Sequence, residues 1–368
     1  MTDATGIVAW IGAALAVVSM ALLFARLRRL PRQDTASGEL PRVSIVIPAR
    51  DEEQNLSRLL PSLGRQTVPP HEVIVVDDQS SDGTAEMVQT HGARLIRGRE
   101  LRSGWYGKPW ACHQGVEAST GDWLLFLDAD VELEADALER LLSAAAAEPG
   151  AVFSVCPWHR IECAYEELSV FFNLLMVGGI GAFTWRGDQA TGIGLYGQTF
   201  LVSRKRYGEL GGHEAVKQTV LENLKLAKKC EELGIPRRCF VGRGSISMRM
   251  FPGGYREMVE SWAKGFSSGA ALASPAALLL ASLWLTGLMM LTVCVFLLVV
   301  WDARVMVGAA YLAVAIPTAI LFRQVGRFSV VNALLFPVSL LFYQGLFAVA
   351  VMRKRKKVST SWKGRHVD

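Results

Sequence analysis

Two carboxylates stand one residue apart directly after an apolar run. The run is Trp123–Leu127, and Asp128 and Asp130 follow it. A short apolar run is typical of a buried strand, and ligands of open α/β sheets gather at the carboxyl ends of strands. Two ionised carboxylates lie this close when a cation lies between them, and oxygen ligands favour Mg²⁺ or Mn²⁺. The pattern indicates a divalent-metal site; the alternative is a turn with two solvated acids.

A second strand-like run also ends in paired acids. Glu72–Val76 leads into Asp77 and Asp78, and Ser81–Thr84 then supplies residues suited to cap a helix. The carboxyl ends of parallel strands meet at one edge of a sheet, so these acids are expected near the first pair. Two adjacent acidic strand ends indicate a binding site for a nucleotide and its metal ion.

The elements that must position these acids alternate along residues 41–266. Alternation of β-rich runs with helical periodicity predicts an α/β fold with a mainly parallel sheet covered by helices. We expect strands over Val43–Pro48, Glu72–Asp78, Arg94–Ile96 and Trp123–Leu127, and helices over Glu52–Leu63, Ser81–Val88 and Pro109–Ser119.

Apolar segments flank this region. Hydrophobic residues make up 51 % of the 368 residues, and Ile7–Phe24 is uncharged over a length that can cross a bilayer. No basic stretch precedes it and no small-residue cleavage site follows it, which favours an uncleaved anchor over a signal peptide. The arginine-rich segment Arg26–Arg32 predicts that the following domain lies in the cytoplasm.

The C-terminal part also predicts membrane spans, near Pro275–Val300, Val305–Phe322 and Val330–Val351. With the N-terminal anchor, these make a multi-pass protein of the inner cell membrane. Four crossings would put the basic segment Arg353–Lys357 on the outer face, against the positive-inside tendency. Either one segment is re-entrant, or Ser268–Val300 crosses twice as a hairpin.

Charge and cysteine usage narrow the class of partner. The net charge is +5 and the basic residues gather beside the apolar segments, so anionic lipid headgroups are expected partners and nucleic acid is not. The six cysteines have no paired spacing, which indicates a reducing compartment without a zinc site or a disulfide framework.

Three patterns occur in order: VSIVIPARDEE at 43–53, VVDDQSSDGT at 75–84 and Asp128-Ala129-Asp130. They resemble family 2 glycosyltransferases, which have the GT-A fold, and the resemblance covers residues 42–266. Further motifs resemble a membrane subgroup that includes 4,4′-diaponeurosporenoate and hopanoid-associated glycosyltransferases; they are GWYGKPWAC at 104–112, Gly197-Gln198, GGHEAV at 211–216 and MRMFPGG at 248–254. The lipid acceptors of that subgroup suit the apolar ends of this chain.

The resemblance implies a UDP-sugar site formed by Pro48, Ala49, Arg50, Glu52, Asp77, Asp78, Lys108 and Asp128. Asp78 can accept the imide N–H of uracil. Lys108 stands at an expected helix start, where free backbone N–H groups and a cation suit a diphosphate. The alternatives are a cap or turn role for Asp77, a helix-dipole role for Glu52 and a solvated lysine.

The same resemblance implies the metal ligands. Asp130 would bind Mg²⁺ or Mn²⁺, and Asp128 would reach the ribose or the same ion. Glu132 would complete the shell or remain an exposed acid in a loop. The metal would stabilise, as a Lewis acid, the charge that grows on the departing diphosphate.

The catalytic base departs from the family pattern. The family has Glu-Asp at a helix start, where the Asp is the general base, and this chain has Glu222-Asn223. An amide takes no proton at neutral pH. Three interpretations follow: Glu222 is the base, a carboxylate acceptor with a pKa near ~4 needs little base, or the chain is impaired.

The acceptor side is assigned to Gly197, Gln198, His213 and Trp262, with His213 expected to be a structural turn residue rather than a catalyst. Residues 164–183 are expected to form an amphipathic segment along an acceptor groove. Tyr255–Phe266 predicts an amphipathic helix on the membrane surface, where Lys264 reaches the diphosphate or the headgroups.

These observations predict a membrane-bound, inverting hexosyltransferase that moves one sugar from a UDP-sugar to a hydrophobic lipid, such as a carotenoid acid. The alternatives are transfer to a polyprenyl phosphate and a weakly catalytic nucleotide-sugar-binding subunit. The expected domains are an anchor and basic linker (1–40), the GT-A domain (41–254), an interfacial helix (255–270), membrane helices (271–352) and a basic tail (353–368).

Overall fold

The computed structural model describes residues 2–32, 40–190, 192–219, 221–269, 274–297, 304–355, 360–362 and 365–367. The chain divides into two compact units. The α/β unit comprises Leu27–His159 and Asp188–Arg249, and the helical unit comprises Met1–Arg26, Arg160–Gly187 and Met250–Asp368. Residues 160–187, which the sequence places inside the 41–254 domain, therefore pack with the apolar helices.

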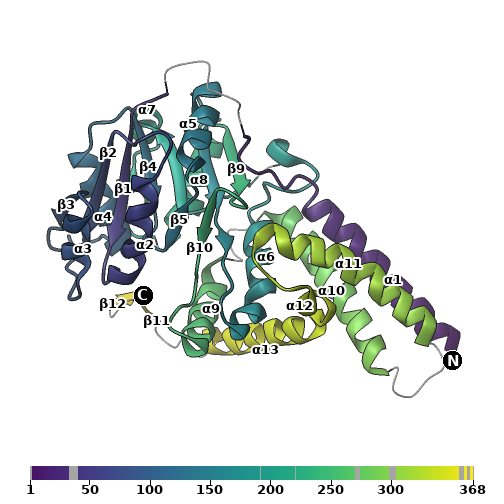
Figure 1. The fold of residues 1–368 in the computed structure, drawn as a ribbon. Helices are drawn as coiled ribbons and strands as arrows, with labels where there is room; N and C mark the ends of the chain where they lie inside the picture. Colours follow the sequence, from purple (N-terminus) through teal and green to yellow (C-terminus); the bar gives the residue numbers. More distant parts are fainter. Residues whose placement is uncertain are drawn as a thin grey trace. The chain divides into compact units, whose positions relative to one another are not determined.

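A seven-stranded sheet forms the centre of the α/β unit (Figure 1), in the order β3-β2-β1-β4-β8-β6-β9. Neighbours are parallel except at β8, which runs antiparallel to both β4 and β6. The predicted α/β fold with a mainly parallel sheet is confirmed. The strands are β1 (Val43–Ala49), β2 (Glu72–Asp77), β3 (Arg94–Arg97), β4 (Trp123–Leu127), β6 (Val152–Cys156), β8 (Thr199–Ser203) and β9 (Arg237–Val241).

Helices follow the strands, and α2, α3 and α4 lie close to the positions that the sequence predicts. They are α2 (Glu53–Gly64), α3 (Thr84–Thr90), α4 (Gly107–Ala118), α5 (Ala137–Ala147), α7 (Arg204–Glu209) and α8 (Glu222–Glu232), with a 3-10 turn η2 (Gly187–Gln189) and another, η3 (His213–Val216). A Cβ added at Gly115 of α4 would lie 2.3 Å from Val46 Cγ1 of β1. Glycine at this position therefore lets α4 lie close to the sheet, with Lys108 in its first turn.

A small second sheet continues from the acidic turn after β4. It has the order β5-β10-β7, formed by β5 (Val131–Leu133), β10 (Ile246–Met248) and β7 (Trp158–His159). Val131 and His159 both pair with Met248. The turn that carries Asp128 and Asp130 is thereby held between two sheets.

The basic linker after the N-terminal helix joins the α/β unit. The Val241 N–H donates to the Arg28 carbonyl at 2.7 Å, and Arg29 forms a parallel bridge with Val241. The Arg28 guanidinium is paired with Asp188. This pairing, with the Asp188 hydrogen bond as its first cause, raises the Arg28 pKa. Arg28 of the basic linker is therefore paired with an acidic residue of the protein itself.

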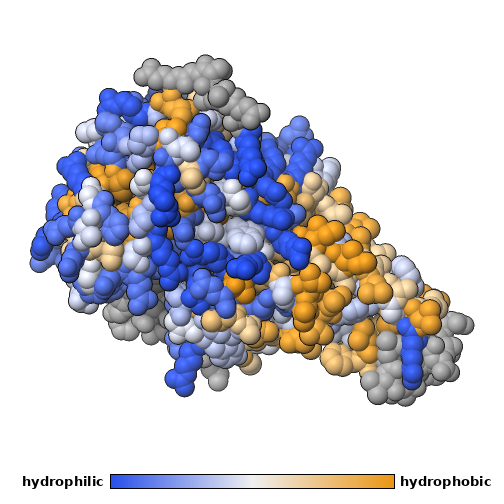
Figure 2. All heavy atoms as spheres, in the orientation of Figure 1, coloured by the Kyte–Doolittle hydropathy of each residue, from blue (hydrophilic) through white to orange (hydrophobic). Residues whose placement is uncertain are grey.

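Three long apolar helices of the helical unit are long enough to cross a bilayer: Ala4–Leu23 in α1 (Thr2–Leu23), α10 (Pro275–Leu297) and α11 (Arg304–Val325). Figure 2 shows apolar side chains gathered on their surface. A Cβ at Gly287 would lie 2.5 Å from the Gly12 carbonyl, so α1 and α10 cross in close contact. The hairpin alternative for Ser268–Val300 is wrong over 275–297, which form one helix; residues 298–300 lie outside the described part.

The expected span Val330–Val351 is not one helix. It is divided into α12 (Val330–Leu334) and α13 (Phe336–Arg355). Pro337 explains the break, because proline disfavours the helical conformation of the residue before it and fits the first turn of a new helix. The apolar stretch Phe336–Met352 is shorter than 18 residues, which at 1.5 Å per residue is less than the ~30 Å of a bilayer core.

α13 packs against α9 (Tyr255–Gly269), α6 (Val170–Gly179) and the 3-10 turn η1 (Ala164–Ser169). Figure 1 shows α13 beside α9, running in a different direction from α1, α10 and α11. α6 is almost wholly buried, so it is a core helix of this unit. The last residues form a hairpin of β11 (Thr360–Trp362) and β12 (Arg365–Val367) within the expected basic tail.

Candidate active site

The loops after β1 and β2 are joined to each other. The Asp78 N–H donates to the Ala49 carbonyl at 2.8 Å, the Asp51 N–H to Ser80 Oγ at 2.9 Å and the Ser81 N–H to Asp51 Oδ1 at 2.7 Å. The Ser81 N–H is the first cause that lowers the Asp51 pKa. This network holds together the two loops at which the nucleotide is predicted to bind.

Two residues of these loops adopt left-handed backbone conformations without being glycine. Asp51 has φ +52° and Gln79 has φ +60°. Such conformations cost free energy and persist where the surrounding contacts impose them, which is common in binding loops. Ser80 and Ser81, which hold Asp51, belong to the DDQSSDGT motif; Ser81 was expected to cap a helix, and Ser80 had no predicted role.

The predicted nucleotide residues lie together at these strand ends. Asp77 and Asp78 are 9 % and 5 % exposed. Asp77 Oδ1 accepts from the Ser80 N–H at 2.9 Å, which is the turn role given as its alternative. Asp78 Oδ2 lies 3.7 Å from Arg50 Nη1. Pro48 is half-buried and Ala49 is buried.

Glu52 sits at the N-cap of α2. Its N–H donates to Thr84 Oγ1 at 2.9 Å, and its Oε2 accepts from Asn55 Nδ2 at 2.6 Å. The residue therefore links the first turns of α2 and α3, and its negative charge also acts on Asp130, as described below.

Lys108 lies at the centre of a cluster of carboxylates. Its Nζ is 2.7 Å from Asp128 Oδ1 and 2.9 Å from Glu222 Oε1, and 3.4 Å from the Gly197 carbonyl oxygen. The side chain is 25 % exposed. Burial opposes the charge, but Asp128 and Glu222 outweigh it and raise the Lys108 pKa well above its usual value. The solvated-lysine alternative does not describe this side chain.

The members of this cluster come from three distant segments. Lys108 lies in the first turn of α4, Asp128 directly after β4 and Glu222 at the first residue of α8. The Asp128 N–H donates to the Gln198 carbonyl at 3.1 Å. The structure thus gathers the predicted diphosphate, metal and base residues with the backbone of Gly197 and Gln198.

Asp130 carries a buried oxygen, Oδ1, that has no hydrogen-bond partner. Burial first, then the negative charges of Asp128 and Glu52, raises the Asp130 pKa to about 7. An orphaned carboxylate oxygen close to a second carboxylate fits a divalent cation that binds oxygen.

The described residues hold no group of three His, Cys, Asp or Glu side chains arranged to bind a metal. An ion held by two aspartates would keep coordination positions for phosphate and water oxygens, as Mg²⁺ and Mn²⁺ beside nucleotides commonly do. Glu132 lies on β5 opposite Ser247, and its role as a third ligand stays a prediction.

Asn223 has a specific structural role. Its Nδ2 donates to the Leu195 carbonyl, and a Cβ at Gly197 would lie 3.3 Å from Asn223 Cγ. An ionised aspartate could only accept hydrogen bonds, so it could not replace the amide here. Glu222, 6 % exposed, is the carboxylate of this helix start that faces Lys108.

Among the acceptor-side residues, His213 is structural in the α/β unit. It is 3 % exposed, its Nδ1 lies 2.9 Å from the Tyr207 hydroxyl and its ring packs edge-on against Phe126 at 4.7 Å. Burial lowers its pKa to about 3, so the ring stays neutral. The sequence analysis missed Tyr207, its partner.

Trp262 belongs to the helical unit. Its ring stacks on Phe172 at 4.7 Å and meets Phe251 at 5.7 Å. These contacts fix α9 to α6. Lys264, the other α9 residue singled out, has a side chain outside the described part.

Comparison with known proteins identifies the family. The sequence model of "Glycosyl transferase family 2" matches residues 44–192. A 4,4′-diaponeurosporenoate glycosyltransferase of Staphylococcus aureus (strain USA300) is 32 % identical over 352 residues, covering 94 % of this chain and 93 % of the relative. This chain belongs to glycosyltransferase family 2. The protein of the same description from Staphylococcus haemolyticus (strain JCSC1435) is 31 % identical and covers 95 % of both chains.

A solved structure of similar fold is the mannosyltransferase PcManGT from Pyrobaculum calidifontis, in complex with GDP-Man and Mn²⁺. It matches with a TM-score of 0.51 at 18 % identity, over 94 % of this chain and 100 % of the other. This likeness confirms the GT-A fold. The family match and the curated relatives identify the chain as a glycosyltransferase, as the sequence predicted.

Proposed function

We propose that this chain is a membrane-bound, inverting glycosyltransferase that transfers one sugar from a UDP-sugar to a hydrophobic lipid. The observation that carries the proposal is the position of Lys108. It joins Asp128, at the end of β4, to Glu222, at the start of α8, with the unpartnered oxygen of Asp130 close by in the chain. The lysine that would bind the diphosphate, the aspartates that would bind the metal ion and the glutamate that would act as base thus lie in one site.

The donor would lie along the joined loops after β1 and β2. Asp78 is nearly buried but keeps acceptor oxygens suited to the uracil imide, and Arg50 beside it limits how that carboxylate can turn. PcManGT binds GDP-Man with Mn²⁺, which supports a nucleotide sugar and a divalent ion here. We assign uridine from the motif resemblance.

Asp128 and Asp130 would hold Mg²⁺ or Mn²⁺. When bound, the ion supplies Lewis-acid stabilisation of the leaving diphosphate. Lys108 would place a second positive charge near the diphosphate, because its ammonium lies beside Asp128, one of the two residues proposed to hold the metal ion. Its release from Glu222 would free that carboxylate to accept the proton of the acceptor.

A lipid acid is the acceptor class that these features support best. The relatives are named for a carotenoid acid, 4,4′-diaponeurosporenoate, and the helical unit exposes apolar side chains along three long helices. A carboxylate acceptor has a pKa near ~4 and is largely an anion at neutral pH, so Glu222 would act as a base only for acceptor molecules that are still protonated.

The membrane arrangement that we propose has three crossings, by α1, α10 and α11. α9 exposes Arg256, Glu257 and Glu260 to solvent and buries Met258, so it suits the membrane surface. Because α13 packs along α9, α13 lies at that depth as well. The basic residues 353–357 then stay on the cytoplasmic side, in accord with the positive-inside tendency.

A labelling assay tests this function. Membranes containing the protein are incubated with Mn²⁺, a long-chain isoprenoid acid and a panel of radiolabelled nucleotide sugars, and labelled lipid is identified by mass. We expect a sugar ester of the acid from one UDP-sugar, and none from Asp130→Asn protein that is present in equal amount. Label in an acid-labile polyprenyl phosphate, or label from the Asp130→Asn protein equal to wild type, would contradict the proposal.

A further inference from the structure

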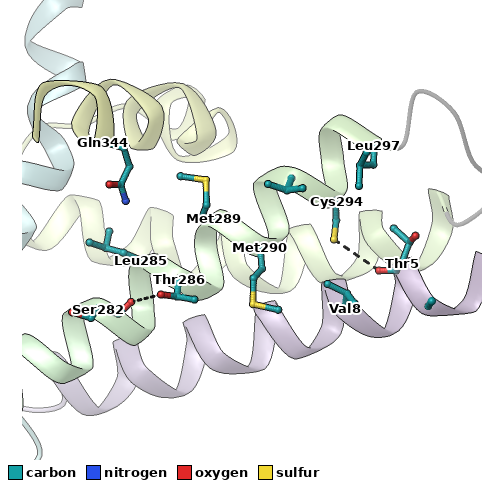
Figure 3. A pocket seen from close by; sticks show the side chains of 12 residues that line it. Thr5, Val8, Ser282, Leu285, Thr286, Met289, Met290, Cys294, Leu297 and Gln344 are labelled. Carbon is teal, nitrogen blue, oxygen red and sulfur yellow. Dashed lines mark hydrogen bonds between the residues drawn. The ribbon is translucent and has the colours of Figure 1, made fainter. Parts of the chain in front are cut away.

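A groove of about 680 Å³ runs along the membrane helices of the helical unit (Figure 3). It lies between α1 and α10, and one side chain of α13, Gln344, completes its lining. Its volume is in the range of sites that bind small molecules. The groove lies outside the cluster of Lys108 and belongs to a single compact unit.

The lining of the groove is mainly apolar. Val8 of α1 and Leu285, Met289, Val293 and Leu297 of α10 face it. Methionine is common where a surface adapts to flexible apolar ligands. Of the hydroxyl groups, Thr286 Oγ1 already donates to the Ser282 carbonyl at 2.8 Å, within the helix.

The groove has the length of a lipid chain. It extends along α10 from Ser282 to Leu297, which at 1.5 Å per residue is roughly 22 Å. A bilayer core is ~30 Å thick. A chain lying along α10 would therefore cover most of one crossing.

One end of the groove carries an unused polar group. Figure 3 shows Gln344 extending from α13 toward Leu285. Gln344 is half-buried, and within the described residues its amide makes no hydrogen bond. A side-chain amide without a partner in an apolar setting is costly, and its two N–H donors suit an oxygen anion.

We propose that this groove binds a long-chain apolar acid, with the chain along α1 and α10 and the carboxylate at Gln344. The inference rests on the proposed function, because this ligand is the acceptor lipid. The carboxylate would then lie at the end of the groove that α13 completes.

Two variants of α10 isolate the groove. Met289→Trp fills it, whereas Leu279→Trp adds the same ring to a position that is 61 % exposed and outside the lining. The full chain in nanodiscs is incubated with a long-chain fatty acid that carries a photoreactive diazirine, and labelled peptides are mapped by mass spectrometry. We expect label in 282–297 of wild type and Leu279→Trp, and about a fivefold loss in Met289→Trp.

Gln344→Leu tests the polar end at nearly constant volume. Loss of a hydrogen bond to a charged group should weaken acid binding about tenfold. The methyl ester of the same acid should bind wild type and Gln344→Leu within about twofold of each other, because an ester carries no charge.

Three results would overturn the inference: label outside α1 and α10, equal labelling of Met289→Trp and Leu279→Trp, or equal labelling by a diazirine phospholipid that the free acid does not displace. The last would make the groove an ordinary lipid contact. Binding needs no sugar transfer, so groove labelling without any glycolipid product would contradict the proposed function alone. Transfer that is indifferent to Met289→Trp would contradict the groove alone.

Discussion

The side-chain amide of Asn223 donates a hydrogen bond to the main-chain carbonyl of Leu195. This contact accounts for asparagine at a position where the motif resemblance implies aspartate. The carbonyl belongs to the segment that leads to Gly197 and Gln198, whose backbone oxygens bond Lys108 and Asp128. Asn223 therefore holds the backbone of the candidate site in place, and Glu222 supplies the carboxylate at the start of α8.

Asn223→Asp should destabilise the protein and give no gain in activity. The aspartate oxygen would face the Leu195 carbonyl without a proton to share, which should cost about 1–3 kcal/mol of unfolding free energy. Thermal unfolding and lipid-linked transfer measure the two effects. A more active Asn223→Asp protein of wild-type stability would identify residue 223 as the site of a lost base.

Glu222→Gln should lower kcat far more than Asn223→Ala does. The glutamine keeps the volume but cannot take a proton and removes one of the two carboxylates that face Lys108. Loss of a general base typically costs 10²–10⁴-fold where the acceptor binds in its protonated form. Single-turnover transfer at saturating donor separates this from binding. Equal, small losses in both variants would show that the acceptor needs no base.

His159 should make stability depend on pH. It is buried, and burial lowers its pKa to about 4 from an ordinary value of 6.5. Between these values the unfolded chain binds a proton that the folded chain does not, so acidification should cost about 1.4 kcal/mol per pH unit.

His159→Phe should remove this part of the slope between pH 6.5 and pH 4, as followed by chemical unfolding in detergent. His91→Gln, at an exposed position, is the matched control and should leave the slope unchanged. A wild-type slope in His159→Phe would show that the buried ring is not the titrating group.

Much of the α/β unit could be predicted from local pattern. Trp123–Leu127 forms the strand that its apolar run indicates, and α2 and α3 start within three residues of the predicted positions. The ion pair between Lys108 and Glu222 could not be predicted in this way, because the two residues are far apart in sequence. Only the order of the strands in the sheet brings α4 and α8 together. The Leu195–Asn223 bond was missed for the same reason.

The helical unit was harder to predict, because hydropathy gives the length of an apolar segment but not the direction in which its helix runs. Val330–Val351 has the composition of a span, yet Pro337 divides it and the second piece packs along α9. Residues 160–187 look like part of the soluble domain by position, but α6 is buried among apolar helices. Both outcomes depend on tertiary contacts.

A reporter fused after residue 368 should detect the cytoplasm. With three crossings, a green fluorescent protein at this end should fluoresce, and alkaline phosphatase should be inactive. Fusions after residue 301, between α10 and α11, should give the opposite pair of results. Active phosphatase at the C-terminus would show that α13 crosses the bilayer.

The most direct test of the account is the effect of Mn²⁺ on UDP binding, measured by calorimetry on the full chain in detergent. If Asp128 and Asp130 hold a cation that binds the diphosphate, Mn²⁺ should raise UDP affinity at least about tenfold in wild type and leave Asp130→Asn unaffected. Equal UDP affinity with and without Mn²⁺ in wild type, or a full Mn²⁺ effect in Asp130→Asn, would contradict it.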